Sequence, residues 1–402
     1  MTSKKVWYIS KYALNSNQGG PSRQYLFSKY FSKKGFETCL ISSNSNGFNY
    51  LKFNGDYKLF ETLNFKHFIL KGSQINLGFN FKRIWSWFLF EYRMLKFLKK
   101  KDISKNDIVI VSSLSILTFL SGIYLKRKYK MRLLVEVRDI WPLTLVEFKN
   151  LSKYNPIVIF LSIIEKLAYK YADVIVGTMG NLGEHLKSVY PGSENKFHYI
   201  PMGLDHSIFE NYEFNTIEEK NNDFIVGYAG TIGLVNKVDL ILEAAELLKD
   251  NKIIKFVILG NGVLKDFYVN KFSHLSNVEF LPKVNKNKVG QFLDKCDILL
   301  HPVEDKKIYQ FGVSPNKWID YMFSAKPVIV SYNGFKNIIN EANCGEFIDT
   351  DNPKLLVDTI VKYSYKSKDE LRQIGQNGKK YLEENLTYDI LSDKYIRLFN
   401  NV

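Results

Sequence analysis

The stretch Ser314, Pro315, Asn316 and Lys317, with Asp320 one turn further on, combines residue types that could bind an anion at a helix start. A serine before a proline is typical of such a start. Its hydroxyl can accept a hydrogen bond from a free first-turn amide, and a proline at the first position has no amide to leave unpaired. Free amides attract anions, whereas a lysine in the first turn opposes the helix dipole. We therefore expect a phosphate at Lys317, with an ordinary surface lysine on a capped helix as the alternative.

The size and composition of the chain indicate what must position these residues. With 402 residues it exceeds what one hydrophobic core usually organises, so two domains are expected. Hydrophobic residues make up 46% and charged residues 24%, which is typical of a globular protein. Cys39, Cys296 and Cys344 are odd in number and far apart, which indicates neither a disulfide framework nor a zinc site and fits a reducing cytoplasm.

Positive charge is concentrated in the first half of the chain. Residues 1–200 contain 31 Lys and Arg against 13 Asp and Glu, a net charge of +18, whereas residues 201–402 contain 25 against 28, a net charge of −3. A basic half attracts nucleic acid, anionic lipid or a polyphosphate substrate, and composition alone does not choose among them.

Two stretches bear on targeting and membranes. The first ten residues, MTSKKVWYIS, pass from lysines into a short apolar strand, so no secretory signal is expected. Residues 108–125 carry no charge and reach the lower length limit of a membrane span, but their serines and Gly122 favour a buried strand followed by a helix. We therefore expect a cytoplasmic protein without a membrane span.

Short apolar runs alternate with helical patterns through residues 1–205. A strand at VWYIS, a helix at about 21–34 and a strand at ETCLISS form the first βαβ unit. Further strands are expected at DIVIVSS, LLVEVRD, ADVIVGT and FHYIPMG, with a long helix at 157–171. This order predicts an α/β fold, with a doubly wound, Rossmann-like N-terminal domain.

A polar segment between Asp205 and Asp223 separates this series from a second one. The second series contains the strands FIVGYAG, IKFVILG, VEFLP, CDILLHP, KPVIVS and GEFIDT, with helices between them. We expect residues 206–384 to form a second Rossmann-like domain. The amphipathic segment at about 385–402 should pack back on the first domain as a C-terminal helix.

At the level of motifs the chain resembles retaining glycosyltransferases of family 4, particularly the bacterial branch that builds O-antigen, capsule and other surface polysaccharides. The matching stretches run in order along nearly the whole chain and include EVRDIWP (136–142), EKLAYKYADVIVGT (165–178), YAGTIGLVNKVDLILEAAELL (228–248) and GVSPNKWIDYMFSAKPVIV (312–330). The resemblance implies a GT-B fold, in which two Rossmann-like domains face each other across a cleft. It also implies transfer of a sugar from a nucleotide diphosphate sugar, with a UDP-sugar as the expected donor.

Such a transfer breaks the anomeric C–O bond and leaves negative charge on a diphosphate, which the enzyme must neutralise. The resemblance assigns this diphosphate to Lys317 and to the helix start at 314–316, and the ribose hydroxyls to Asp320. In the first domain, Gly19 and Gly20 could bring backbone amides to the phosphates, with Arg23 in the same first turn. A tight turn without a ligand is the alternative for the two glycines.

The chain departs from the family pattern near the donor sugar. Two glutamates separated by seven residues commonly contact the sugar and the ribose, and Asp320 lies at the position of the second. The first position is Gly312, which leaves Tyr309, Gln310 and neighbouring amides as candidates for the sugar contact.

A second departure follows the first strand of the second domain. The family often has an arginine and a lysine there, both on the diphosphate. Thr231 stands at the arginine position, and Lys237 is the candidate for the lysine, with a solvated lysine before a helix as the alternative.

In the first domain, Arg138 lies where many relatives have a histidine that contacts the donor sugar. Arginine is not a general base, but it can bind a phosphate or orient Asp139 beside it. We expect both residues to take part in catalysis, and a purely structural cluster with Glu136 is the alternative.

The resemblance implies retention of the anomeric configuration by front-face attack, in which the leaving phosphate takes the acceptor's proton. It therefore predicts neither a Ser–His–Asp set nor paired catalytic carboxylates. No cofactor and no metal ion are expected, since Asp349-Thr350-Asp351 follows a strand and is more simply a polar turn.

Residues 79–101 mix aromatic and basic side chains, and KRKYKMR at 126–132 adds more positive charge. This composition is typical of an interfacial membrane helix, although a core helix would also be apolar. We expect peripheral attachment to the anionic inner face of the cytoplasmic membrane. The expected acceptor is linked to undecaprenyl diphosphate or is an oligosaccharide, and no nucleic acid is expected.

Three other functions were considered. A nucleotide-sugar 2-epimerase shares the two-domain fold but needs acids and histidines around the sugar ring, and the six histidines are scattered. A dinucleotide dehydrogenase would have GxGxxG after the first strand, where only one GG occurs. A non-catalytic basic protein on a membrane or nucleic acid leaves SPNKWID without a purpose.

Overall fold

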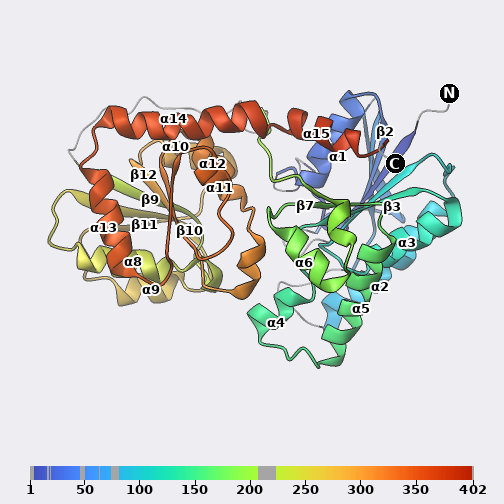
Figure 1. Cartoon of the computed structure of the whole chain (residues 1–402), viewed down its shortest axis with the longest axis horizontal. Helices are drawn as coiled ribbons and strands as arrows, with labels where there is room; N and C mark the ends of the chain where they lie inside the picture. Colours follow the sequence, from blue (N-terminus) through green and yellow to red (C-terminus); the bar gives the residue numbers. More distant parts are fainter. Residues whose placement is uncertain are drawn as a thin grey trace. The chain divides into compact units, whose positions relative to one another are not determined.

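A computed structural model of the chain describes residues 4–400 apart from 16–17, 19, 46–49, 63, 74–80 and 207–222. The chain forms two compact units (Figure 1): unit 1 combines Met1–Pro201 with Tyr388–Val402, and unit 2 spans Met202–Thr387. Each unit has a largely parallel sheet covered by helices, so the predicted pair of Rossmann-like α/β domains is confirmed.

In unit 1 the strand order is β3-β4-β2-β1-β5-β6-β7-β8. The strands are β1 (Lys5–Ile9), β2 (Glu37–Ser43), β3 (Tyr57–Thr62), β4 (Phe65–Leu70), β5 (Ile108–Ser112), β6 (Arg132–Val137), β7 (Val174–Gly177) and β8 (Phe197–Tyr199). Val6 of β1 pairs in parallel with Thr38 of β2 on one side and with Ile108 of β5 on the other. All five residues of β5 are buried, as expected for a central strand with helices on both faces.

The helices of unit 1 follow these strands in the chain. They are α1 (Arg23–Lys33), α2 (Phe81–Leu98), α3 (Thr118–Tyr129), α4 (Leu143–Lys149), α5 (Pro156–Tyr171), α6 (Leu182–Val189) and α15 (Tyr388–Arg397). Among the described residues, none of the helices combines the length and the apolar character that a membrane span needs. The uncharged stretch 108–125 divides between β5 and α3, as predicted.

The last helix, α15, completes unit 1 by packing on α1, although the two are far apart in the sequence (Figure 1). Rings pack at this contact, with the centroids of Phe27 and Tyr395 5.1 Å apart. Lys34 Nζ adds ion pairs to Asp389 at 3.0 Å and Asp393 at 2.8 Å.

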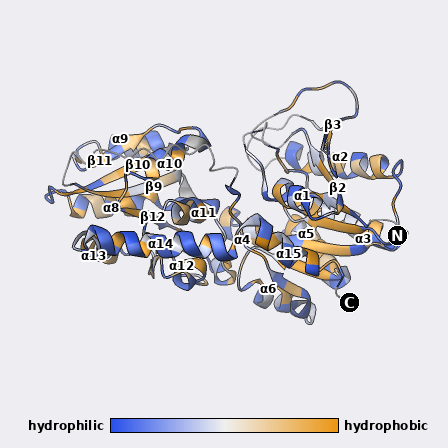
Figure 2. Ribbon diagram, turned by 90° about the horizontal axis from the view of Figure 1, so that it is seen from above, coloured by the Kyte–Doolittle hydropathy of each residue, from blue (hydrophilic) through white to orange (hydrophobic). Residues whose placement is uncertain are grey.

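In unit 2 the strand order is β11-β10-β9-β12-β13-β14, and the pairings are parallel. The strands are β9 (Phe224–Thr231), β10 (Ile254–Asn261), β11 (Val278–Leu281), β12 (Ile298–Pro302), β13 (Val328–Ser331) and β14 (Gly345–Ile348). The helices are α8 (Val238–Leu247), α9 (Lys265–Lys271), α10 (Val289–Leu293), α11 (Asn316–Phe323), α12 (Ile338–Glu341), α13 (Pro353–Ser364) and α14 (Lys368–Asn385). Figure 2 shows hydrophobic residues along the strands, whereas hydrophobic and hydrophilic residues alternate along the helices.

Candidate active site

The helix α11 begins one residue later than the sequence predicts. Pro315 is its N-cap residue in an extended conformation, Asn316 is the first helical residue, and no side chain caps the helix. The hydroxyl of Ser314 instead accepts a hydrogen bond from the backbone N–H of Met202 at 3.2 Å. The predicted serine cap is therefore wrong, because this hydroxyl fixes the chain that leads into unit 2.

Lys317 lies in the first turn of α11, where it contacts the end of β9. Its Nζ donates hydrogen bonds to Tyr228 Oη at 3.2 Å and to Asn236 Oδ1 at 3.1 Å, and it lies 4.6 Å from the centroid of the Tyr228 ring. Gly230 makes room for it, because a Cβ there would come within 2.9 Å of Nζ. An ammonium group has three donors, so these two partners leave one N–H for a ligand oxygen.

The environment of Lys317 disfavours its charge. Burial lowers the pKa of Lys317 to about 7, and the nearby carboxylate of Asp320 only partly opposes this effect. The two hydrogen-bond partners of its ammonium group are neutral. A bound anion would give this ammonium group the negatively charged hydrogen-bond partner that Tyr228 and Asn236 do not provide.

Asp320 lies one turn further along α11 and forms an ion pair with Lys286. The Asp320 side chain is only 12% exposed, whereas that of Lys286 is 46% exposed. Burial raises the pKa of Asp320, and Lys286 opposes that shift. The carboxylate is therefore held beside the helix start by a cation whose own side chain is half in solvent.

Two other expected donor residues, Thr231 and Lys237, lie at the end of β9 and shortly after it. The carbonyl of Thr231 accepts hydrogen bonds from Tyr228 Oη at 2.8 Å and Asn236 Nδ2 at 3.0 Å. Lys237 does not contact Lys317 or Asp320 in any described interaction but forms an ion pair with Asp351.

The segment Tyr309–Gly312 forms a compact turn before α11. The carbonyl of Tyr309 accepts hydrogen bonds from Tyr332 Oη at 2.7 Å, Gly312 N at 2.9 Å and Phe335 N at 3.0 Å. Gly312 has a φ of 101°, a backbone conformation that favours glycine. A glutamate at this position would be strained, which gives the departure from the family pattern a local reason.

In unit 1, Arg138 and Asp139 directly follow β6. Their backbone amides both donate to Ser113 Oγ, at 2.8 and 3.1 Å, so the end of β5 fixes this turn. Glu136 does not join them. It accepts from Arg23 Nε at 2.9 Å and from Tyr8 Oη at 2.7 Å, so these contacts of Glu136 do not support the alternative of a structural cluster with Arg138 and Asp139.

Arg23 differs most from its expected role. Its side chain is fully buried, and besides Glu136 it donates to the carbonyls of Ile200 and Pro201. It therefore holds β8 and β6 together and is not placed to contact a phosphate. Gly20 has a φ of 114°, as a tight turn requires, and Gly19 lies outside the described residues.

Comparison with known proteins shows what unit 2 is similar to. Residues 210–381 match the family model described as Glycosyl transferases group 1. The match covers most of unit 2 and indicates that this part of the chain is similar to group 1 glycosyltransferases.

One curated relative is similar to part of the chain. An uncharacterised glycosyltransferase of Methanocaldococcus jannaschii, MJ1178, is 27% identical over 150 residues, which cover 36% of this chain and 39% of the relative. The chain thus matches about two fifths of that relative's length.

Solved structures show the fold over the whole chain. Sucrose-phosphate synthase from Thermosynechococcus elongatus has a TM-score of 0.76 at 12% identity, covering 98% of each chain. Anabaena Alr3699/HepE in complex with UDP and glucose has a TM-score of 0.66 at 12% identity, covering 99% of this chain and 100% of that one. The chain therefore shares with these structures a fold of two Rossmann-like α/β domains.

Within unit 2, the structure brings Lys317 and Asp320 together with the segment 314–316 and with the end of β9. It does not bring Lys237 to them. Sequence reasoning missed Tyr228, Asn236 and Lys286, because none of them belongs to the SPNKWID stretch. Tyr228 and Asn236 both belong to the stretch YAGTIGLVN, which includes the end of β9. This position was the sequence feature that could have marked them as site residues.

Sequence reasoning also missed a buried polar group in unit 1. Lys11 follows β1 and Glu91 lies on α2, and burial brings the pKa of each to about 7. Glu91 accepts from Thr118 Oγ1 at 2.7 Å and Ser121 Oγ at 2.5 Å, while Lys11 Nζ donates to the carbonyl of Ser45 at 3.3 Å. Among the described residues, no cluster of His, Cys, Asp and Glu has the make-up of a metal site.

Proposed function

We propose that this glycosyltransferase transfers a sugar from a nucleotide diphosphate sugar, with a UDP-sugar as donor, to a lipid-linked or saccharide acceptor, with retention of the anomeric configuration. The reaction would serve the synthesis of a bacterial surface polysaccharide. A UDP donor is supported by the complex of the structural neighbour Alr3699/HepE with UDP and glucose. Retention and the pathway rest on the family resemblance.

The observation that carries the proposal is the position of Lys317. Its ammonium group lies at an uncapped helix start with neutral partners and one N–H to spare. A diphosphate at this point would accept from that N–H and from first-turn amides, and it would restore the charge of the lysine.

Asp320 supplies the second part of the donor site. With its carboxylate one turn from Lys317, it can accept hydrogen bonds from ribose hydroxyls, and Lys286 opposes the rise in its pKa that burial causes. Ser314, Pro315 and Asn316 shape the helix start, while Tyr309 and Gly312 shape the preceding turn toward the sugar. Thr231 borders the same site, and we assign Lys237 to its rim.

In the proposed reaction, the bond between the anomeric carbon and the phosphate oxygen breaks while the acceptor oxygen bonds to the same face of that carbon. The bonding electron pair stays with the diphosphate, which takes the acceptor's proton. Lys317 and the amides of α11 stabilise the charge that develops on the diphosphate. Arg138 and Asp139, together with Gly20 and Gly19, are the proposed contributions of unit 1.

The proposed acceptor places the reaction at a membrane. An undecaprenyl-diphosphate-linked sugar would be presented at the inner face of the cytoplasmic membrane, and the basic first half of the chain would favour peripheral attachment there. Residues 81–101 and 126–132 are the basic segments that the sequence singled out; residues 79–80 lie outside the described residues.

The decisive experiment is a thermal-shift panel of UDP, GDP, dTDP, ADP and CMP on the purified protein. A ligand that binds only the folded state stabilises it in proportion to the logarithm of concentration over Kd. We expect UDP to raise the melting temperature, and we expect Lys317→Ala and Asp320→Ala to lose that increase. No shift with any nucleotide would overturn the proposal.

A matched control separates binding from stability. Lys380→Ala removes an exposed lysine from α14 in the same unit and should keep the full UDP shift. With a UDP-sugar and an acceptor, NMR of the product then reports the anomeric configuration. Conversion of the donor to its 2-epimer without an acceptor would instead favour the epimerase.

A further inference from the structure

The helix α5 exposes apolar side chains that no described part of the chain covers. Ile159, Phe160 and Ile163 are 46%, 45% and 54% exposed. Phe160, Ile163 and Leu167 follow one another at helical spacing, so they form a stripe along one face. A helix that only served the core would turn this face inward.

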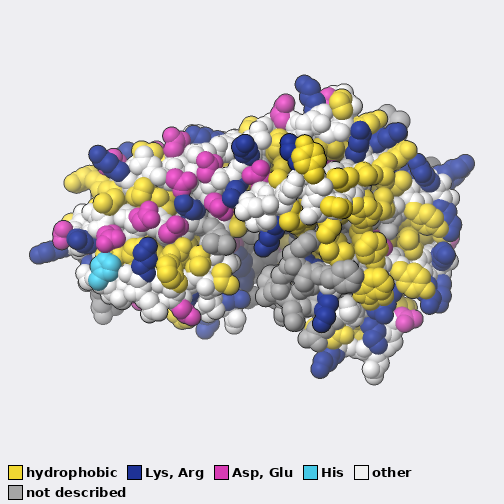
Figure 3. All heavy atoms as spheres, turned by 90° about the horizontal axis from the view of Figure 1, so that it is seen from below, with side chains coloured by type: hydrophobic (Ala, Val, Ile, Leu, Met, Phe, Trp, Pro, Cys, Tyr) yellow, Lys and Arg dark blue, Asp and Glu magenta, His cyan; other side chains and the backbone are white. Residues whose placement is uncertain are grey.

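The helix α2 carries a second stripe of the same kind. Trp85, Phe88 and Tyr92 are 60%, 45% and 65% exposed and recur at helical spacing. The helix α3 packs against both α2 and α5 and adds Leu120 and Tyr124 between the stripes. Figure 3 shows hydrophobic side chains gathered over this part of unit 1, with Lys and Arg around them.

The charges on these three helices are strongly asymmetric. Their acidic residues are Glu91 on α2 and Glu165 on α5. Both side chains are buried, and both accept hydrogen bonds from neighbouring hydroxyl groups. The exposed charged residues of α2, α3 and α5 are therefore all basic. They include Lys82, Lys96, Arg127, Lys128, Lys166 and Lys170.

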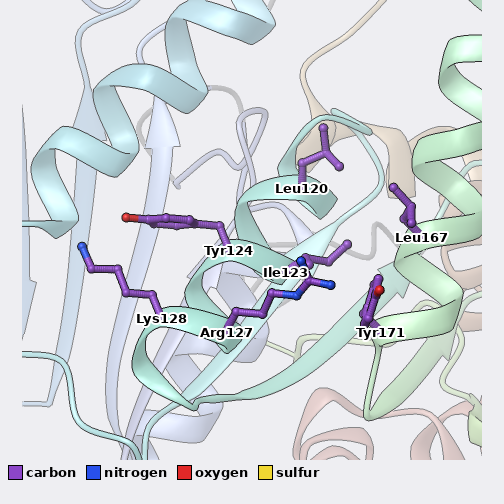
Figure 4. Close-up of a pocket in the computed structure, with 7 residues that line it drawn as sticks. All are labelled: Leu120, Ile123, Tyr124, Arg127, Lys128, Leu167 and Tyr171. Atoms are coloured by element: carbon purple, nitrogen blue, oxygen red, sulfur yellow. The ribbon is translucent and has the colours of Figure 1, made fainter.

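A groove between α3 and α5 is lined by both apolar and basic side chains. Leu120, Ile123 and Leu167 provide an apolar floor to a cavity of about 620 Å³. Figure 4 shows Arg127 beside Tyr171 of α5 and Lys128 near Tyr124. The guanidinium carbon of Arg127 lies 4.4 Å from the Tyr171 ring centroid, so the cation is held at the rim while its donors stay accessible.

We infer that the face formed by α2, α3 and α5 docks on an anionic phospholipid bilayer, with an anionic headgroup at Arg127 and Lys128 in the α3–α5 groove. The inference rests on the proposed membrane-bound acceptor and names the surface that reaches it. Apolar stripes insert into the interface, and a rim with only basic charges matches an anionic surface but repels a basic one. The stripe on α5 does not belong to the segments 79–101 and 126–132, which the sequence alone had indicated as membrane contacts.

Vesicle flotation of the full chain tests the inference. The protein should float with vesicles of phosphatidylcholine mixed with phosphatidylglycerol and remain behind with phosphatidylcholine alone. Arg127→Ala combined with Lys128→Ala should weaken binding by about 30-fold at low salt, from about 1 kcal/mol for each basic residue. Phe160→Asp combined with Ile163→Asp should weaken it by about tenfold or more.

Matched controls carry the same chemical changes in unit 2. Phe267→Asp alters an apolar side chain of α9 that is 57% exposed, and Arg372→Ala with Lys380→Ala removes two exposed cations from α14. Both controls should float like the unmodified protein. Binding that is unchanged in the α3 and α5 variants would overturn the inference, as would a dimer that only Phe160→Asp dissociates.

The UDP thermal shift separates this test from that of the proposed function. The groove and stripe variants should keep the full shift, because they leave unit 2 unchanged. A normal UDP shift without vesicle binding would overturn the docking face alone. Vesicle binding that the variants abolish, without any nucleotide shift, would support the docking face and overturn the proposed donor chemistry.

Discussion

Arg23 in unit 1 and Lys317 in unit 2 occupy similar places in the sequence, each in the first turn of a helix that follows a strand and a loop. Their surroundings are opposite. Arg23 is fully buried against the carboxylate of Glu136 and two backbone carbonyls. Among the described residues, Lys317 has as hydrogen-bond partners the neutral oxygens of Tyr228 and Asn236.

The difference shows that the partners of a buried cation decide its role. A cation paired with a carboxylate stabilises the fold, whereas one with neutral partners can bind an anionic ligand. A buried carboxylate satisfies Arg23 and fixes it, because separating the pair would leave a charge in a dry interior. Lys317 is left with a lowered pKa and a free donor, so an anion can improve its environment. Four experiments test this difference between Arg23 and Lys317.

Replacement of Arg23 should have the largest effect, and it should be on stability. Arg23→Met leaves the buried Glu136 with the Tyr8 hydroxyl as a donor but without its cationic partner, which should lower the free energy of unfolding by about 3–5 kcal/mol. Guanidinium denaturation measures this change. A second substitution, Glu136→Gln, should recover part of the loss, and a loss below about 1 kcal/mol would mean that Arg23 is not a structural cation.

Replacement of Lys317 should affect binding and leave stability nearly unchanged. Lys317→Ala removes a charge-assisted hydrogen bond of about 1.5–3 kcal/mol, so the Kd for UDP should rise by about 10–150-fold. Isothermal titration calorimetry gives the Kd, and the melting temperature of the unliganded variant is the control. An unchanged Kd would remove the contrast with Arg23.

The pH dependence of UDP binding should report the same lysine. Because the pKa of Lys317 is lowered to about 7, most of the free protein lacks this proton above that pH, and a bound diphosphate should restore it. UDP affinity should therefore fall by up to about tenfold per pH unit above pH 7, with proton uptake on binding. Calorimetry at pH 8 in two buffers of different ionisation enthalpy measures the uptake. Lys317→Arg should abolish it, and equal heats in both buffers would contradict the assignment.

Loss of the Tyr228 hydroxyl should have the smallest effect. Tyr228→Phe removes one neutral hydrogen bond to Lys317 but keeps the ring below its ammonium group. We expect the Kd for UDP to rise by about 2–10-fold, in line with about 0.5–1.5 kcal/mol for such a bond. The pH at which affinity begins to fall should shift at the same time, which a purely structural tyrosine would not cause.

Much of the fold follows from local sequence patterns. The helix expected at 157–171 is α5 (Pro156–Tyr171), and the strand expected at DIVIVSS is β5. The hairpin of β3 and β4 was not predicted. None of the six residues of β3 is fully buried, so the strand shows neither an apolar run nor the alternation of a half-buried strand.

The candidate site was less predictable, because its decisive features depend on distant partners. The first turn of α11 was identifiable from SPNK, whereas the true position of the Ser314 hydroxyl depends on Met202. Nothing near Arg23 in the sequence points to Glu136. The sequence showed that Gly312 replaces a glutamate but not that its backbone requires a positive φ.

The return of α15 to unit 1 has a consequence for synthesis on the ribosome. Residues 202–387 form one uninterrupted unit, whereas unit 1 lacks its final helix until residues 388–397 emerge. The N-terminal unit, although translated first, is therefore the last to be completed. A stop codon just before Tyr388 would spare every residue of the proposed donor site in unit 2 and still leave Phe27 and Phe31 of α1 exposed on the nascent protein, where chaperones and proteases would meet them.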